Sequence, residues 1–108
     1  MEKIHFDEFK KIELRVGKII DAEDIPESEK LVKLKVRLES EDRQIIAGIK
    51  KSYPPSTLIG KEVIVVANLA TRTMIGYESD GMLLATRDGD DIVLLRPERD
   101  VPEGSSVS

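Results

Sequence analysis

Hydrophobic and polar residues alternate most strictly in the segment LVKLKVRLE, at positions 31–39. A period of two is typical of a β-strand with one buried face, because successive side chains point to opposite sides. The apolar positions are therefore expected to face a core, and they are Leu34, Val36 and Leu38. The outer face then carries three cations about 6 to 7 Å apart: Lys33, Lys35 and Arg37.

Five further segments are predicted to be strands, at residues 12–20, 43–49, 63–69, 81–86 and 92–95. The first of them alternates, and Gly17 is expected to form a bulge in it. The run VIVVA that opens the third is rich in β-branched residues, which is typical of a strand buried on both faces. The last two flank the turn Asp88-Gly89-Asp90 and are predicted to form a hairpin.

Two short helices complete the prediction. Asp7 is expected to cap a helix over residues 8–11. The segment SYPPSTLIGK, residues 52–61, has its second proline suited to a first helical turn and Gly60 suited to the end. This helix falls between the predicted strands at residues 43–49 and 63–69, which are the third and fourth in chain order. Five or six strands with one short helix in that place predict an all-β OB-fold, a small Greek-key barrel, in a single domain spanning residues 1–108.

The amino-acid composition indicates what kind of core to expect and which side chains are unusual. Aromatic residues make up 4% of the chain and tryptophan is absent, so the core must be aliphatic. Cysteine is also absent, 35% of the residues are charged, and Gln44 and Asn68 are the only side-chain amides, a pattern typical of a heat-adapted protein. Two amides retained against that background are candidates for hydrogen-bonding a ligand. A satisfied turn or strand-end cap explains each of them equally well.

Charge and hydropathy limit the class of partner. The net charge of −4 argues against indiscriminate binding to polyanions. Residues 1–60 are neutral, with 12 basic and 12 acidic side chains, so a locally basic surface on a mildly acidic body is compatible with this total. The longest wholly apolar run has five residues and the first residues are charged, so neither a transmembrane helix nor a signal peptide is predicted and a cytoplasmic location is expected.

The residues of the chain give little support to the hypothesis that the protein is an enzyme. The single histidine, His5, lies near the N-terminus, where an ordinary surface role explains it. Without cysteine there is no thiolate zinc site and no thiol nucleophile, and the glycine-rich phosphate-binding motifs and the G-x-S-x-G motif are missing. We therefore expect a protein that is not an enzyme and that needs neither cofactor nor metal.

Binding to nucleic acid fits the residues better. The outward cations at positions 33, 35 and 37, with Lys30 and Arg43 nearby, are suited to pair with phosphates. The amides of Gln44 and Asn68 are suited to read an exposed base edge. A solvated strand face explains each single cation as well. Only Tyr53 and Tyr77 are available to stack on bases, so a folded RNA is favoured over a threaded single strand.

Six segments in order along the chain resemble one known family: ELRVGKI (13–19), SEKL (28–31), RQIIAGI (43–49), YPP (53–55), VVANL (65–69) and GYESDGMLLA (76–85). The family is the tRNA-binding domain shared by free-standing structure-specific tRNA-binding proteins and by the C-terminal extension or beta subunit of methionyl-tRNA synthetase. The export chaperone CsaA is a more distant relative. The resemblance covers about residues 6–107. It implies an OB-fold whose terminal additions make it a dimer, and a domain that binds the tRNA elbow without reading an anticodon. The residues that match the family's binding surface are Arg43, Asn68, Arg72, Ser79 and Met82.

Three departures from the family pattern predict weaker or altered phosphate contacts. The usual H-P-N-A-D-K-L is IPESEKL at residues 25–31, which keeps Lys30. The serine of R-Q-I-V-S-G-I is Ala47, which removes a hydroxyl. The basic triplet often seen as P-R-K is Thr71-Arg72-Thr73, which leaves one cation.

The resulting hypothesis is a non-catalytic tRNA-binding homodimer that is free-standing or that aids methionyl-tRNA synthetase in trans. Apolar side chains in the terminal segments are expected to form the dimer contact, because they lie outside the predicted strands and a small barrel gains stability from a partner: Ile4, Phe6, Phe9, Val101 and Val107. The alternative hypothesis is a CsaA-like export chaperone on the same fold, which should carry an apolar groove for unfolded peptides.

Overall fold

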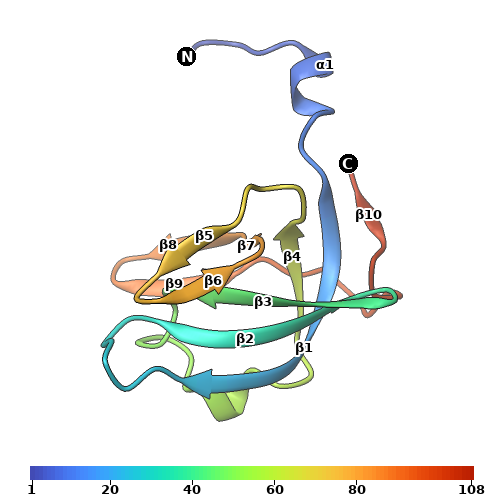
Figure 1. The fold of residues 1–108 in the computed structure, drawn as a ribbon. Helices are drawn as coiled ribbons and strands as arrows, with labels where there is room; N and C mark the ends of the chain where they lie inside the picture. Colours follow the sequence, from blue (N-terminus) through green and yellow to red (C-terminus); the bar gives the residue numbers. More distant parts are fainter.

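The computed structural model describes residues 1–108, and its main body is a curled β-sheet (Figure 1). A four-residue helix, α1 (Phe6–Phe9), comes first and stands apart from the sheet. The strands of the sheet are β1 (Leu14–Asp24), β2 (Val32–Leu38), β3 (Glu41–Ala47), β4 (Glu62–Val66), β7 (Met82–Leu83) and β10 (Ser106–Val107). The 3-10 helix η1 (Pro55–Thr57) lies between β3 and β4. Two hairpins complete the fold: β5 (Arg72–Met74) with β6 (Tyr77–Ser79), and β8 (Ala85–Asp88) with β9 (Asp91–Leu94).

The sheet order is β3-β2-β1-β4-β7, with β10 added to β1. The first part of the long strand β1 pairs antiparallel with β4, and its second part pairs antiparallel with β2. The sequence predicted a bulge at Gly17, but the register between β1 and β2 shifts between Ile19 and Asp21, so the irregularity lies there. One strand shared by two partners in this way curls the sheet on itself, and the all-β, OB-like barrel predicted from the sequence is confirmed.

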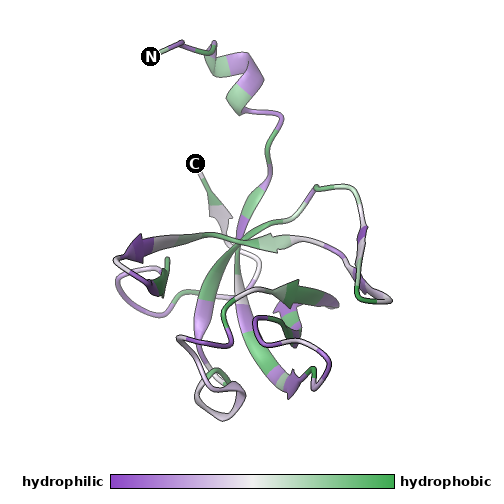
Figure 2. Cartoon of the chain, turned by 90° about the vertical axis from the view of Figure 1, so that its left-hand side faces the viewer, coloured by the Kyte–Doolittle hydropathy of each residue, from purple (hydrophilic) through white to green (hydrophobic).

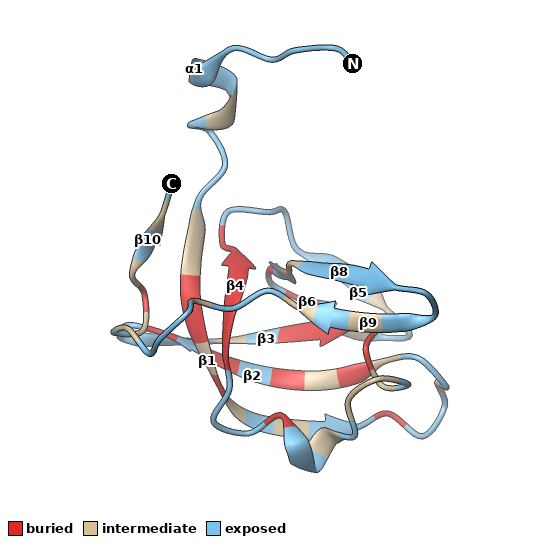
Figure 3. Ribbon diagram, turned by 180° about the vertical axis from the view of Figure 1, so that it is seen from behind, coloured by how far each residue is buried: buried red, intermediate tan, exposed pale blue.

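The core is aliphatic, as the composition predicts (Figure 3). Val32, Leu34, Val36 and Leu38 of β2 are each at most 4% exposed, while the alternate positions of the strand are not buried. All five residues of β4 are buried, as expected for a strand covered on both faces. The alternation that defines β2 in the sequence therefore places its cations on the outside of the barrel.

A buried hydroxyl closes the barrel between β3 and β6, which are not paired as strands. Ser79 is 1% exposed, and its Oγ accepts a hydrogen bond from the Ile46 N–H at 3.0 Å. The same hydroxyl donates to the Gly81 carbonyl at 3.0 Å. The Asp80 N–H also donates to the Gln44 carbonyl at 2.8 Å. These contacts fasten the β5–β6 hairpin to the edge of β3.

Several local predictions were wrong. The helix near the N-terminus begins at Phe6 with His5 as its N-cap, and Asp7 lies in its first turn and not at the cap. The Glu8 carboxylate accepts from the His5 N–H at 3.1 Å, which supplies the capping contact. The sequence predicted no strand between residues 69 and 81, but this segment contains the β5–β6 hairpin. It also predicted no strand after residue 95, but the chain contains β10, which pairs with Leu14 and Arg15 of β1.

The N-terminal arm, residues 1–12, projects from the barrel with green hydrophobic positions along it (Figure 2). Ile4 is 61% exposed and Phe6 is 71% exposed. Single exposed apolar side chains are ordinary, but several gathered on one projecting segment mark a candidate interaction surface. None of the helices is long and apolar enough to cross a membrane.

We predict that Gly17→Ala destabilises the fold. A Cβ added at Gly17 would lie 2.5 Å from Val36 Cγ1 and 3.0 Å from Leu38 Cδ2, inside the core. Such overpacking costs about 1 to 3 kcal/mol, which should lower the melting temperature measured by calorimetry. The matched control is Gly48→Ala, where the nearest atom to an added Cβ is Leu31 Cδ2 at 3.9 Å. Equal melting temperatures for both variants would contradict the assigned packing.

Candidate nucleic-acid interface

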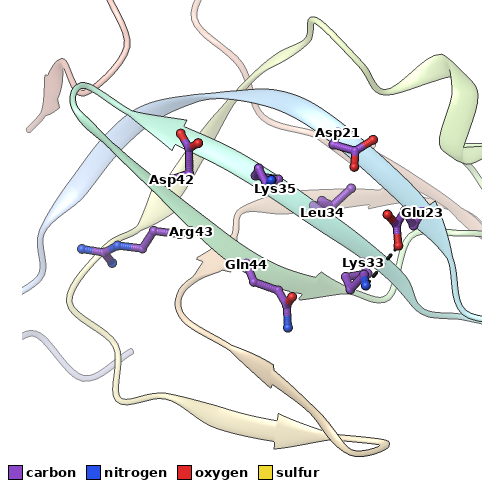
Figure 4. Close-up of a pocket in the computed structure, with 8 residues that line it drawn as sticks. All are labelled: Asp21, Glu23, Lys33, Leu34, Lys35, Asp42, Arg43 and Gln44. Carbon is purple, nitrogen blue, oxygen red and sulfur yellow. Dashed lines mark ion pairs between the residues drawn. The ribbon is translucent and has the colours of Figure 1, made fainter.

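The outer face of β2 forms one wall of a polar hollow of about 400 Å³ (Figure 4). Its lining comes from β1, β2 and β3 and consists of Asp21, Glu23, Lys33, Leu34, Lys35, Asp42, Arg43 and Gln44. The antiparallel register sets Lys35 opposite Gln44, so a cation and an amide share one face. The structure thus brings together four of the predicted contacts in this lining, Lys33, Lys35, Arg43 and Gln44, and Arg37 continues the same face of β2.

The cations of this face differ in their electrostatic state. Lys33 forms an ion pair with Glu23 at 3.0 Å, and this hydrogen bond raises the pKa of the lysine. Arg37 binds Asp42 through two hydrogen bonds, of 2.9 and 3.2 Å, which lower the pKa of the Asp42 carboxyl. Lys35 lies between them, is exposed and has no ion-pair partner. Lys35 is therefore the cation on β2 that is free to meet an anion without breaking an existing contact.

Arg43 has a different position from the one expected. Its neighbour across the register is the buried Val36, although its side chain also lines the edge of the polar hollow. The guanidinium donates from Nη1 to the Ala67 carbonyl and from Nη2 to Glu41 Oε1 at 3.0 Å, and its side chain is only 17% exposed. The arginine therefore ties β3 to the end of β4, and the phosphate contact predicted for it would have to compete with these hydrogen bonds.

Gln44 faces outward next to the β5–β6 hairpin. Its Nε2 donates to the Glu78 carbonyl at 2.9 Å, which leaves the side-chain oxygen directed at no protein donor. Tyr77 of the same hairpin holds the Lys33 ammonium 5.4 Å from its ring centroid. The other tyrosine, Tyr53, is partly buried and packs against the core, and its hydroxyl accepts from the Leu94 N–H at 3.1 Å, so its ring is not presented to a base. The hairpin therefore forms a second wall of the interface, which the sequence did not predict.

Asn68 clamps the N-terminal arm to the barrel. Its Oδ1 accepts from the Glu13 N–H at 2.8 Å, and its Nδ2 donates to the Lys11 carbonyl at 2.6 Å. The adjacent Ala67 N–H donates to the Glu13 carbonyl at 2.8 Å, so the side-chain amide continues the ladder between β1 and β4 beyond the end of β4. Asn68 therefore makes a long-range contact within the chain, which is a role different from both the local cap and the RNA contact considered for it from the sequence.

The remaining predicted contacts do not share one surface. Ser79 is buried and its hydroxyl both accepts and donates a hydrogen bond in closing the barrel, so its contact with RNA stays a prediction that these bonds do not favour. Met82 is 36% exposed and lines an apolar groove beside the arm. Arg72 is exposed on β5 opposite Ser79, and Lys30 is exposed just before β2. Neither cation has an ion-pair partner.

We predict that Asn68→Asp loosens the arm. Aspartate keeps the acceptor for Glu13 but directs a carboxylate oxygen at the Lys11 carbonyl, where the amide now donates. The lost hydrogen bond should cost about 1 kcal/mol, and hydrogen exchange of the amides of residues 8–13 should accelerate. Unchanged exchange and melting temperature together with weaker RNA binding would instead place this amide in an RNA contact.

Comparison with known proteins identifies the family. The family model described as "Putative tRNA binding domain" matches residues 14–106. The chain is 49% identical over 107 residues to the methionine–tRNA ligase of Methanococcus aeolicus, and the match covers 99% of the chain but 16% of that ligase. The chain is thus similar to a small part of a much longer enzyme.

Two solved structures are similar over the full chain. A MetRS related protein from Pyrococcus horikoshii has a TM-score of 0.93 and 38% identity, with 100% of both chains covered. The chaperone CsaA from Bacillus anthracis has a TM-score of 0.90 and 28% identity, with 99% of this chain and 100% of CsaA covered. The outer cationic face, the OB-like barrel and the family match lead to one conclusion: the chain belongs to the tRNA-binding domain family that is related to methionyl-tRNA synthetases and to CsaA.

Proposed function

We propose that the protein is a non-catalytic, cytoplasmic module that binds tRNA at its elbow, on its own or as a partner that aids methionyl-tRNA synthetase in trans. The observation that carries the proposal is the outer face of β2 and β3, where the unpaired Lys35 lies beside the exposed amide of Gln44. The family match over residues 14–106 supports RNA as the ligand of such a face.

The electrostatics favour a shaped contact over general attraction to polyanions. The chain carries a net charge of −4, and the hollow is lined by as many acids (Asp21, Glu23, Asp42) as cations (Lys33, Lys35, Arg43), so a phosphate gains there only from a cation that no carboxylate already pairs. On β2 two of the three cations are already paired with Glu23 and Asp42. An RNA backbone seated here gains most from Lys35 and has to compete with those carboxylates at the two neighbouring positions. Because of this competition, binding to this face depends more on the shape of the RNA than on its total charge.

We predict that Lys35→Ala weakens binding of all tRNA species to a similar extent. A lost phosphate contact removes about one unit from the slope of log affinity against log salt concentration and carries no sequence preference. Filter binding at several salt concentrations measures both quantities. The control is Lys61→Ala, an exposed lysine that does not line the polar hollow. A slope equal to that of wild type in Lys35→Ala would place the RNA on another face.

We further propose that the protein is a homodimer, and its surface area supports this. A folded monomer of 12.1 kDa is expected to expose about 6,000 Å², whereas this chain exposes 7304 Å². The excess of roughly 1,300 Å² exceeds the ~800 Å² that each partner buries in a standard interface. The projecting arm with Ile4 and Phe6 accounts for part of this area.

A groove at the base of the arm provides the place for the partner copy. It has a volume of about 510 Å³, and seven of its nine lining residues are hydrophobic, among them Phe9, Leu69 and Met82. Val107 lies at this end as well, because it pairs with Leu14. Val101 does not, since its N–H binds Glu62 at the opposite end of β4. We therefore drop Val101 from the dimer contacts suggested by the sequence.

We predict that Phe6→Asp converts the dimer to a monomer, because it places a charge in the apolar contact. Light scattering at micromolar concentration should show the mass halved. The matched control is Ile59→Asp, which changes an equally apolar side chain that is 56% exposed and lies outside the groove, and it should leave the mass unchanged. A monomeric mass for the wild-type protein would contradict the dimer.

The chaperone alternative has one observation in its favour. An apolar groove was the feature expected of a peptide binder, and the groove beside the arm is present in a chain whose fold is similar to CsaA. The two hypotheses differ in the ligand that competes. A gel shift with bulk tRNA should persist in the presence of excess unfolded polypeptide if the RNA function is right. Loss of the shift with polypeptide, at a similar affinity for both, would favour the chaperone.

A further inference from the structure

A second cationic cleft lies beyond the N-terminal end of β2, and the sequence did not indicate it as a unit. It has a volume of about 420 Å³ and is lined by Lys30, Gly48, Lys51, Arg87, Asp90 and Ile92. The three cations come from three separate segments: the β1–β2 connection, the segment after β3, and strand β8. Only one acid, Asp90, lines the cleft with them. An anion is the ligand that this lining fits.

The cations of the cleft are all exposed and unpaired. Lys30, Lys51 and Arg87 have no carboxylate within 4.0 Å, whereas Lys33 and Arg37 on β2 each have one. Adjacent like charges repel one another, and this repulsion is relieved when an anion binds among them. The cleft therefore offers more uncompensated positive charge to a phosphate than the outer face of β2 does.

Hydrogen bonds hold the first two walls of the cleft in fixed positions. The Lys50 N–H donates to the Lys30 carbonyl at 3.0 Å, and the Lys50 ammonium donates to the carbonyls of Ile25 and Ser28. The Ser28 hydroxyl in turn accepts from the Lys30 and Leu31 N–H groups at 3.1 and 3.0 Å. The neighbouring Lys50 thus fixes the backbone that carries Lys30 against the segment that carries Lys51.

The third wall is attached to the same segment. The Ser52 hydroxyl accepts from the Ile92 N–H at 2.8 Å, and the Tyr53 hydroxyl accepts from the Leu94 N–H at 3.1 Å. Arg87 is the register partner of Ile92 across the β8–β9 hairpin, so its backbone position follows from these bonds. A site whose backbone is already ordered loses less entropy when it binds a ligand.

We propose that this cleft is a second binding site for the phosphodiester backbone of RNA, continuous with the face that carries Lys35. The inference rests on the proposed RNA-binding function and extends it. Lys30 precedes the first residue of β2 by two positions, so the cleft begins where the outer row of Lys33 and Lys35 ends. Five residues of chain separate Lys35 from Lys30, which keeps their Cα atoms within roughly 18 Å of each other. A folded RNA can therefore contact both sites at once, and a mononucleotide cannot.

The test is the salt dependence of tRNA binding by the triple variant Lys30→Ala, Lys51→Ala, Arg87→Ala. Loss of two or three phosphate contacts should lower the slope of log affinity against log salt by about two units and weaken binding at low salt by at least about tenfold. The matched control, Lys61→Ala, Arg96→Ala, Arg99→Ala, removes the same charge from exposed positions that do not line the cleft. The control should keep the slope within about half a unit of wild type.

The outcomes separate the two proposals. A wild-type protein that does not bind tRNA would overturn the proposed function and the cleft with it. Wild-type binding with equal slopes in the triple variant and the control would overturn the cleft alone. Titration with adenosine monophosphate provides the second arm, and we expect no saturation in the concentration range where tRNA binds. Tight mononucleotide binding that the triple variant abolishes, with tRNA affinity unchanged, would assign the cleft to a small phosphorylated ligand and contradict the proposal.

Discussion

The hydrogen bonds of the Ser79 hydroxyl are the contact on which the arrangement of this barrel depends. The strands β3 and β6 do not pair in register, yet Ser79 accepts from Ile46 and donates to Gly81 in the space between them. A buried N–H that loses its acceptor is costly, so this hydroxyl keeps the barrel closed at its seam. The β5–β6 hairpin is held against β3 by the same contacts, and the hairpin is what gives the polar face of β2 and β3 its second wall. The residue that resembles a family binding position thus supports the surface from inside.

The two ends of the barrel are organised by polar contacts in place of large aromatic side chains. At one end Asn68 joins the arm to β4, and the apolar groove opens beside it. At the other end Lys50 and the Ser52 and Tyr53 hydroxyls join the loops that carry the cationic cleft. The proposed protein partner therefore uses one end of the barrel, and the proposed second RNA site lies at the other end. Separation of this kind allows a dimer to present two RNA surfaces that point away from its own interface.

The sequence predicted those features that depend on local periodicity. The strict alternation of β2, the buried β4, the DGD hairpin turn and the short helix before Gly60 all follow from residue type and spacing. The order of these strands and the helix predicted an OB-fold, and the family resemblance agrees with it. The sequence could not predict the roles of Arg43, Asn68 and Ser79, because each depends on contacts with residues 24 to 57 positions away. The sequence also missed β10, whose two residues carry no strand pattern of their own and are ordered by pairing with β1. The charge of a residue could be read from the sequence, but whether that charge is free or already paired could not.

The central claim is that RNA lies on the outer face of β2 and β3 and that the barrel beneath it stays closed. Amide chemical-shift mapping of the isotope-labelled protein during titration with tRNA tests it most directly. We expect the largest changes at residues 33–37, at Gln44 and in the β5–β6 hairpin, with little change in the arm and in the groove beside it. Changes concentrated in the arm and groove, with the β2 amides unaffected, would contradict the claim.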